Sequence, residues 1–410
     1  MSRKSFTLFA LLLMTILTIV ACGQADTPET APTNLPRPTA AQTSYKEATV
    51  DDSSADLSPD ALDDFVDFVE ENRQAYEIPG LAVAVVRGNE IVLAQGFGVK
   101  DIRGDDPVTP ETLFHIGSTN KSVTAMLIAT LVDDGLFDWD TPVVEIVPEF
   151  ELSDAESTQQ ATIRHLLSMS SGIPDDAEDD FDLEDADAAD VFDLVAEAEL
   201  LGPPGEVFSY SNPSNAISGY IGVLADGGDF DNLYEGYAEQ LQRRIFDPIG
   251  MESATLSVEE AHANPNMSAS HIFEDGEVVV AESYDFTGDP LAPSGSIKAS
   301  VVDMARYMIT QVNRGVAPDG TRVVSAANLT ETWQPAIDTG ENTDYAMGWE
   351  VGRNEEADVI WHEGAYDSFT SILVFMPATK SGLVVLTNLD DPDDFLEVMR
   401  NEFTKLITSG

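Results

Sequence analysis

The sequence has a single cysteine, Cys22, in 410 residues, which excludes an internal disulfide and any metal site built from several cysteines. Basic residues are also few, since 20 Lys and Arg stand against 74 Asp and Glu and the formal net charge is -54. Such a surface repels phosphate backbones, so nucleic acids are excluded as partners. The histidines lack the spacing of zinc ligands, and no metal or other cofactor is predicted. They are His115, His165, His262, His271 and His362.

The excess of acidic residues predicts that the stability of the fold depends on salt. Exposed carboxylates repel one another, and the Debye length falls to roughly 3 Å at 1 M salt, which removes most of this repulsion. We therefore expect the melting temperature to rise from low to molar salt. Thermal unfolding at several salt concentrations checks this, and a flat melting temperature would refute it.

The first 22 residues predict a secretory signal. Arg3 and Lys4 precede an apolar run from Phe6 to Val20, which is too short for a comfortable membrane span. Ala21-Cys22 follow the run. This junction resembles the bacterial lipobox, in which the cysteine is lipidated and becomes the mature N-terminus. We expect a signal peptide over residues 1–21, a lipid on Cys22 and a protein secreted across the cytoplasmic membrane and anchored at the cell envelope. The alternative is an ordinary signal peptide with an incidental cysteine.

Residues 22–57 are typical of a tether that follows the lipidated cysteine. Four prolines lie here among Thr, Ala and Gln, with few large apolar residues, so the segment cannot bury enough surface to fold. The folded domain is therefore expected over residues 58–410. Hydrophobic residues make up 43% of the chain, which is enough for an extended core.

Strand-like runs lie near both ends of the folded part, and its middle is mostly helical. Ser58-Pro59 is a strong helix start, and the apolar spacing continues to about Tyr76. Gly88-Asn89 between two apolar runs indicates a hairpin. The predicted strands are Leu81–Val86, Ile91–Val99, Tyr345–Val351, Phe369–Phe375 and Leu383–Asn388, and the last helix is Asp391–Ile407. This predicts an α+β fold of three layers: an antiparallel sheet flanked by N- and C-terminal helices, with a large all-helical subdomain over about 117–285.

The stretch Asp175–Glu199 is dense in Asp and Glu, and no Lys or Arg occurs between Arg164 and Arg243. We expect a solvated loop or helix face. A calcium site is the alternative, but the stretch lacks the oxygen spacing and the glycine of an EF-hand.

Ser118-Thr119-Asn120-Lys121 precedes apolar residues at helical spacing, which predicts a buried helix from about Ser118 to Gly135. A serine at the first turn lies where the helix N-terminus stabilises negative charge, and Lys121 would lie above it on the same face. A partly buried amine with a lowered pKa can take the serine proton. By itself, Ser-x-x-Lys is a weak signal that also fits a helix cap with a surface lysine.

Two later motifs strengthen this interpretation. Tyr210-Ser211-Asn212 offers a phenol that can relay protons and an amide that can bind a substrate carbonyl. His362-Glu363-Gly364 leads into the predicted strand Phe369–Phe375, where a glycine lets a ligand backbone approach closely. Separately, each also fits a structural role, as a packed loop aromatic or a satisfied histidine.

In this order the three motifs resemble those of the serine β-lactamase and penicillin-binding-protein superfamily, and most closely its class C β-lactamase, D-aminopeptidase and esterase branch. The resemblance covers roughly residues 58 to 408. It is supported by the stretches Thr109–Phe114, Thr162–Leu167, Ser171–Pro174, Ile245–Met251, Ala292–Gly295, Gly348-Trp349 and Val384–Asn388.

The resemblance implies a role for each residue. Ser118 would be the nucleophile and Tyr210 a general acid–base, and the proton acceptor is left open between Lys121 and Tyr210. Asn212 would hold the substrate amide or ester. The oxyanion would be bound by the backbone N–H groups of Ser118 and Ala365, the residue after Gly364.

One departure from the family concerns the third motif. Dedicated β-lactamases and most transpeptidases have Lys-Thr-Gly there, and the lysine helps bind the substrate carboxylate. His362, placed here as a substrate-binding residue, would do so poorly because its imidazole is largely neutral. This weakens the expectation of efficient penicillin hydrolysis and favours esters or uncommon peptides.

Together these observations predict an extracytoplasmic serine hydrolase that acts through a covalent acyl-enzyme, as an esterase, D-peptidase or carboxypeptidase. Its partners would be a small acyl substrate or cell-wall peptide and, through the lipid, a membrane. Two alternatives stay open: a β-lactamase proper, and a non-catalytic cell-wall-binding lipoprotein that retains the fold. The sequence favours an enzyme, because a binding module would have no need of all three residues Ser118, Lys121 and Tyr210.

Overall fold

The computed structural model describes residues 57–408 except 180, 182, 184, 284–287, 341, 353–357, 391 and 393. The predicted signal peptide, Cys22 and nearly all of the predicted tether lie outside these residues. Within the described ranges, each helix falls short of the length and apolarity that crossing a membrane requires.

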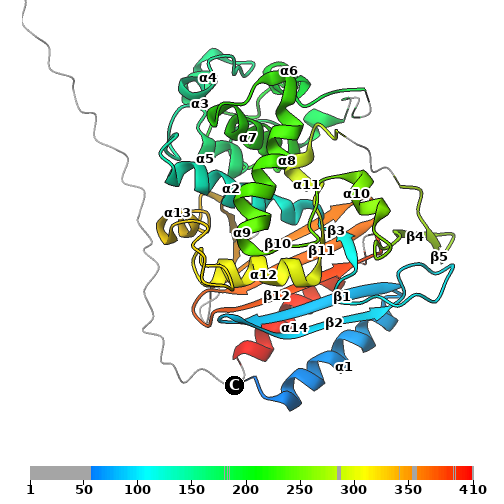
Figure 1. The fold of residues 1–410 in the computed structure, drawn as a ribbon. Coiled ribbons are helices and arrows are strands. Elements are labelled where there is room, and N and C mark those ends of the chain that lie inside the picture. The colour runs from blue at the N-terminus through cyan, green and yellow to red at the C-terminus, as the bar shows by residue number, and fades with distance from the viewer. Residues whose placement is uncertain are drawn as a thin grey trace, which may run out of the picture. The chain divides into compact units, whose positions relative to one another are not determined.

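An eight-stranded sheet forms the centre of the fold, and all of its neighbouring strands pair antiparallel (Figure 1). An early and a late strand of the chain pair next to the β2 edge of this sheet, where Val83 of β1 lies opposite Val385 of β12. Across the sheet the strands are β2 (Glu90–Gly98), β1 (Gly80–Arg87), β12 (Ser381–Thr387), β11 (Phe369–Met376), β10 (Val359–Tyr366), β9 (Glu350–Gly352), β8 (Thr343–Tyr345) and β7 (Ile337–Asp338).

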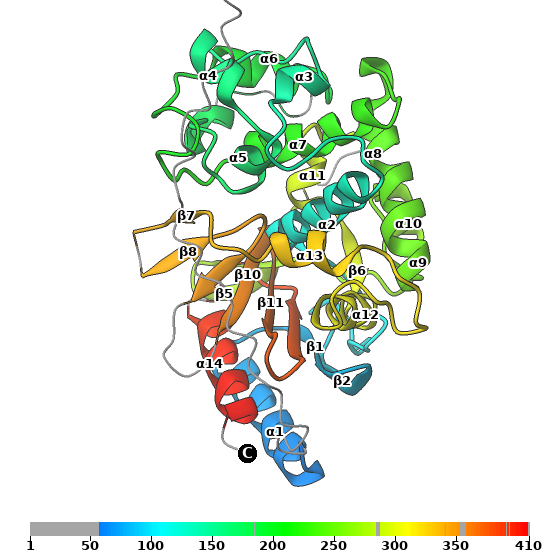
Figure 2. The same cartoon turned by 90° about the vertical axis from the view of Figure 1, so that its left-hand side faces the viewer.

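Helices α1 (Pro59–Ala75) and α14 (Phe395–Thr408) cover one face of the sheet, and α12 (Val301–Val312) with the helical region covers the other (Figures 1 and 2). Successive side chains of a strand point to opposite faces. In β1, Val83 and Val85 accordingly pack with α1 and α14, whereas Ala84 packs with the other core. Because both faces are buried, β1 is a continuous apolar run. The predicted α+β fold of three layers is confirmed.

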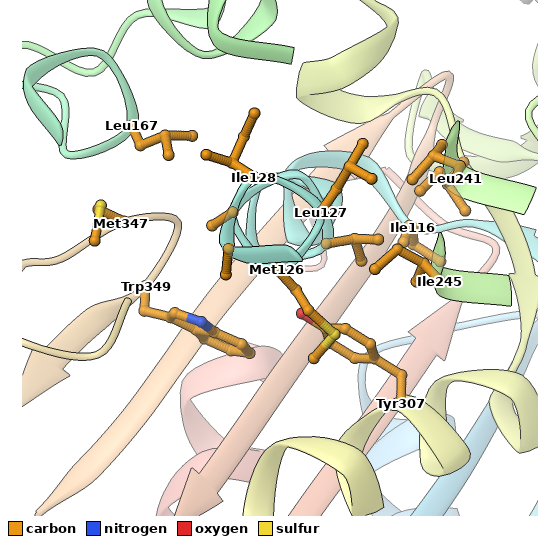
Figure 3. Close-up of a cluster of buried hydrophobic side chains, with 14 of the residues drawn as sticks. Ile116, Met126, Leu127, Ile128, Leu167, Leu241, Ile245, Tyr307, Met347 and Trp349 are labelled. Carbon is orange, nitrogen blue, oxygen red and sulfur yellow. The ribbon is translucent and has the colours of Figure 1, made fainter. Parts of the chain in front are cut away.

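The helical region follows β3 (Leu113–His115) and surrounds α2 (Asn120–Asp133). Apolar side chains from the neighbouring helices and from the sheet side close around α2, among them Leu167, Leu241 and Trp349 (Figure 3). The other helices are α3 (Val143–Ile146), α4 (Ala155–Gln160), α5 (Ile163–Leu167), α6 (Asp190–Glu197), α7 (Asn212–Ala225), α8 (Leu233–Leu241), α9 (Asp247–Ile249), α10 (Val258–Ala263), α11 (Ala292–Gly295) and α13 (Ala326–Glu331). Single turns are η1 (Gly117–Thr119), η2 (Asp175–Glu178), η3 (Phe230–Asn232) and η4 (Gln242–Phe246), and short strands are β4 (His271–Glu274), β5 (Glu277–Val280) and β6 (Lys298–Ser300).

Several predicted elements differ from the structure, among them the last helix, which begins at Phe395 and so later than predicted. The strand over Tyr345–Val351 is wrong: Gly348 has φ +74°, and the resulting turn splits the segment into β8 and β9. His362 does not lead into the strand that follows, because it lies within a strand of its own, β10. The helix expected from Ser118 begins at Asn120, and Ser118 lies in the turn η1 before it.

Candidate active site

Ser118 is the only residue between Thr112 and Leu131 that is not buried. It lies in the 3-10 turn η1, which leads directly into α2. Side chains three residues apart eclipse in such a turn, so Lys121 is held over Ser118. This segment therefore presents one hydroxyl at the surface of an otherwise buried chain.

The turn of Ser118 is packed tightly against β10. Gly117 has φ +51°, and a Cβ there would lie 2.5 Å from the Ala365 backbone nitrogen. A Cβ on Gly364 would lie 2.9 Å from the Ser118 backbone nitrogen. The Ser371 hydroxyl of β11 also donates to the Ile116 carbonyl at 2.7 Å, which pins the start of the turn to the sheet. Only glycine at positions 117 and 364 allows the two backbones to come this close.

Lys121 is fully buried, and its amine has three oxygen neighbours. Nζ is 2.9 Å from Ser118 Oγ, 2.7 Å from Asn212 Oδ1 and 3.0 Å from the carbonyl oxygen of Ser294. Burial lowers the pKa of Lys121 to about 7, although the negative charge of Glu178 acts in the opposite direction. A substantial fraction of this amine is therefore neutral at neutral pH.

Tyr210 and Asn212 meet this amine from the start of α7. The Ser211 side chain caps that helix by accepting from the Ser214 backbone N–H at 3.3 Å, which fixes the residues on either side of it. The Tyr210 ring centroid is 4.8 Å from Lys121 Nζ. Burial raises the pKa of Tyr210, while a hydrogen bond with Ser118 acts against this shift. The phenol therefore keeps its proton at neutral pH.

The carbonyl of Ser294 is a site group that sequence reasoning missed. Ser294 belongs to α11. Its hydroxyl also donates to the backbone carbonyl of Asn212 at 2.7 Å. The neighbouring Pro293 carbonyl accepts from Asn120, Thr124 and Asn215, at 2.8, 2.7 and 2.9 Å respectively. The stretch Ala292–Gly295 was visible only as a family resemblance, because its contribution is a backbone oxygen that leaves no side-chain signal.

Glu178 is the second missed residue, and it lies at the end of η2. Its Oε1 accepts from Asn212 Nδ2 at 2.8 Å, and its Oε2 is buried without a hydrogen-bond partner in the described part of the chain. Burial raises the pKa of Glu178, whereas Asn212 and Lys121 act to lower it. In the sequence, Glu178 could not be distinguished from the many acidic residues around it.

His362 is buried on β10 and faces the site, where its ring centroid is 6.1 Å from that of Tyr210. Nδ1 contacts the Glu363 carbonyl, and Nε2 is 2.8 Å from the Tyr345 hydroxyl. Burial, together with the charge of Lys121, lowers the pKa of His362 to about 3, although the hydrogen bond to the Glu363 carbonyl acts in the opposite direction. The imidazole is therefore neutral: Nδ1–H donates to the carbonyl, and Nε2 accepts from Tyr345.

The structure brings Ser118, Tyr210 and Asn212 together around the amine of Lys121, and His362 lies beside the Tyr210 ring. Gly364 contributes backbone only, and Ala365 is exposed at the end of β10. Strand β9 pairs with Val359–Trp361, so among the described residues the rest of that edge of β10 has no strand partner. Glu363 points away from the site, towards Arg400 of α14 at 3.7 Å.

Comparison with known proteins gives a consistent picture. A family model described as Beta-lactamase matches residues 65–402. Penicillin-binding protein 4 of Amycolatopsis lactamdurans is 31% identical over 77% of this chain and 82% of its own length. Unguisins hydrolase ungD' of Aspergillus campestris (strain IBT 28561) is 27% identical over 82% of this chain, which spans 63% of that relative. The octameric penicillin-binding protein homologue from Pyrococcus abyssi superimposes with a TM-score of 0.71 at 25% identity, over 84% of this chain and 77% of the other.

Proposed function

The chain belongs to the beta-lactamase family, as its motifs predicted, and we propose that it is a serine hydrolase that works through a covalent acyl-enzyme. The observation that carries this proposal is the hydrogen bonding of Lys121. Two of the three oxygens around its amine are carbonyl oxygens, of Asn212 and Ser294, and can only accept. The two hydrogens of a neutral amine are used there, so its lone pair is left facing the Ser118 hydroxyl.

This arrangement favours Lys121 over Tyr210 as the group that deprotonates the nucleophile. Tyr210 holds its proton and cannot accept another, whereas Lys121 titrates near neutrality. Ser118 attacks the substrate carbonyl as its proton passes to Lys121. Tyr210 then protonates the leaving group and regains a proton from Lys121. In deacylation, water attacks the ester of Ser118, its proton is taken by the same amine, and Ser118 leaves with a proton returned to its oxygen.

The oxyanion of the tetrahedral intermediate would be held by the backbone N–H groups of Ser118 and Ala365. Support comes from the close approach of the two glycine-containing backbones, which places these two nitrogens on adjoining segments. Both segments are closely packed against each other, so the two donors would need little rearrangement as negative charge develops.

A fluorophosphonate probe is the sharpest test of the proposed chemistry, because it labels only an activated serine. We expect stoichiometric labelling that peptide mass spectrometry assigns to Ser118. Absence of labelling on the folded protein would favour the alternative of a non-catalytic cell-wall-binding lipoprotein.

We propose neutral esters and uncommon peptides as substrates in preference to penicillins, because His362 is neutral and supplies no cation for a substrate carboxylate. A charged donor adds about 1.5–3 kcal/mol per hydrogen bond, so His362→Lys should raise the rate of β-lactam acylation relative to ester hydrolysis by roughly tenfold or more. Stopped-flow acylation by a fluorescent penicillin and hydrolysis of a p-nitrophenyl ester give the two rates. The neutral His362→Gln protein is the control and should not change the ratio in this direction. A wild type that prefers penicillins would contradict the substrate assignment.

We further propose that lipidation of Cys22 holds the enzyme at the cell envelope, within reach of acyl substrates or cell-wall peptides. This rests on the lipobox-like sequence alone. The Cys22→Ala protein should leave the membrane fraction, because acyl chains supply about 0.8 kcal/mol of binding free energy per buried CH₂. Fractionation of cells followed by immunoblotting measures this, and unchanged membrane association would count against the anchor.

A further inference from the structure

In the acidic stretch Asp175–Glu199, one carboxylate differs from the others in its exposure to solvent. Its described carboxylates are exposed with one exception, Glu178, whose side chain reaches into the site. The stretch is thus mostly the solvated surface that its composition predicted, and Glu178 has a different environment from its neighbours.

Glu178 begins a chain of hydrogen bonds that ends at the nucleophile. Asn212 Nδ2 donates to Glu178 Oε1 at 2.8 Å, Lys121 Nζ donates to Asn212 Oδ1 at 2.7 Å, and Lys121 Nζ is 2.9 Å from Ser118 Oγ. An ionised carboxylate can only accept, so it fixes which end of the Asn212 amide faces it. The amide oxygen must then face Lys121.

This orientation matters for the state of the amine. If the Asn212 amide turned over, its N–H groups would face Lys121, and the neutral amine would use its lone pair there rather than at Ser118. With the oxygen facing Lys121, that lone pair is directed to the nucleophile. We propose that Glu178 is a positioning residue that locks the Asn212 amide and so keeps the lone pair of Lys121 on Ser118. This deepens the proposed function and rests on it.

The charges around these groups are few. Lys121 faces Glu178, the neutral imidazole of His362 on β10 and the protonated phenol of Tyr210 before α7. Glu178 faces Lys121 and feels the negative charges of Asp289 and Asp179. Removing the Glu178 charge therefore withdraws stabilisation from protonated Lys121, which lowers the pKa of the amine.

Two variants separate the hydrogen bond from the charge. Glu178→Gln keeps an acceptor for Asn212 but removes the charge, and Glu178→Ala removes both. The matched control is Asp176→Asn, which removes the same charge from an exposed position of η2. We expect the plateau of kcat/KM for a p-nitrophenyl ester to fall roughly tenfold to a hundredfold in Glu178→Ala, and by clearly less in Glu178→Gln. The acidic limb of the pH profile should move to lower pH by about one unit in both variants.

A second measurement does not depend on turnover. Lysine labelled with ¹³C at Cε reports the titration of Lys121, whose signal is identified by its loss in Lys121→Ala. The titration midpoint should fall in both Glu178 variants and stay in place in Asp176→Asn. Equal plateau losses in Glu178→Gln and Glu178→Ala, or an unmoved Lys121 titration, would overturn the positioning role. A wild type that hydrolyses no ester would instead refute the proposed function, and the titration would still test Glu178.

Discussion

The Ser118→Ala protein is expected to hydrolyse p-nitrophenyl esters no faster than background. Ser118 provides the only hydroxyl that contacts Lys121 Nζ among the described residues, so without it the proposed acyl-enzyme cannot form. Removing a serine nucleophile costs about 10⁶-fold in kcat in a well-studied serine protease, so the loss should reach the limit of the assay. Initial rates at saturating ester measure it.

A matched control is the Ser153→Ala protein, which loses an exposed serine whose hydroxyl contacts the Ala198 carbonyl. Its rate should equal that of the wild type. Thermal unfolding of both variants shows whether the fold is intact. A folded Ser118→Ala protein with full esterase activity would mean that hydrolysis proceeds without this serine.

Much of the site was predictable because its parts are close in sequence or belong to spaced motifs. Ser118 and Lys121 are three residues apart, and a helical turn of either kind superimposes such side chains. The sequence placed the start of the helix two residues too early, at Ser118 and not at Asn120, yet the pairing was unaffected. Tyr210, Asn212 and His362 come from distant segments, and only their resemblance to a known order of motifs placed them with Ser118.

The missed groups were hidden for different physical reasons. The Ser294 carbonyl is a backbone oxygen, and any residue in the same turn would present one. Glu178 is one of many carboxylates in an acidic stretch, and only the fold distinguishes this partly buried one from the exposed ones around it. Strand β10 was missed as a separate element because the polar residues His362 and Glu363 interrupt its apolar pattern. They lie on opposite faces of the strand, His362 towards the site and Glu363 towards α14.

The proposed preference for neutral substrates rests on the charge of His362, which follows from the sequence and the fold together. The sequence shows a histidine at the third motif, which alone leaves open whether it carries charge near neutral pH. Burial and the charge of Lys121 lower the pKa of His362 and keep the ring neutral, and the contact of Nδ1 with the Glu363 carbonyl leaves Nε2 to accept from Tyr345. A protonated ring would place two buried cations side by side, which low dielectric surroundings disfavour.

Replacing Lys121 by alanine is expected to lower kcat/KM for the ester at least about a hundredfold, the lower range for removal of a proton-transfer group. The pH dependence gives a sharper test. Because the amine must be neutral to accept a proton, the wild-type rate should rise with pH and level off above the pKa of Lys121, which is about 7. Neither His362 nor Tyr210 produces this limb, since the pKa of His362 is about 3 and that of Tyr210 lies above its ordinary value.

In the Lys121→Ala protein the limb centred near the pKa of Lys121, about 7, should therefore disappear along with the rate. The Lys121→Arg protein separates charge from proton transfer, because a guanidinium stays charged and cannot serve as the base. It should be as inactive as Lys121→Ala at every pH. The Lys405→Ala protein, which loses an exposed lysine paired with Glu402 at 2.9 Å, should keep the wild-type profile. A Lys121→Ala profile that retained the same limb at reduced height would assign the titration to another group and would mean that Lys121 is not the base.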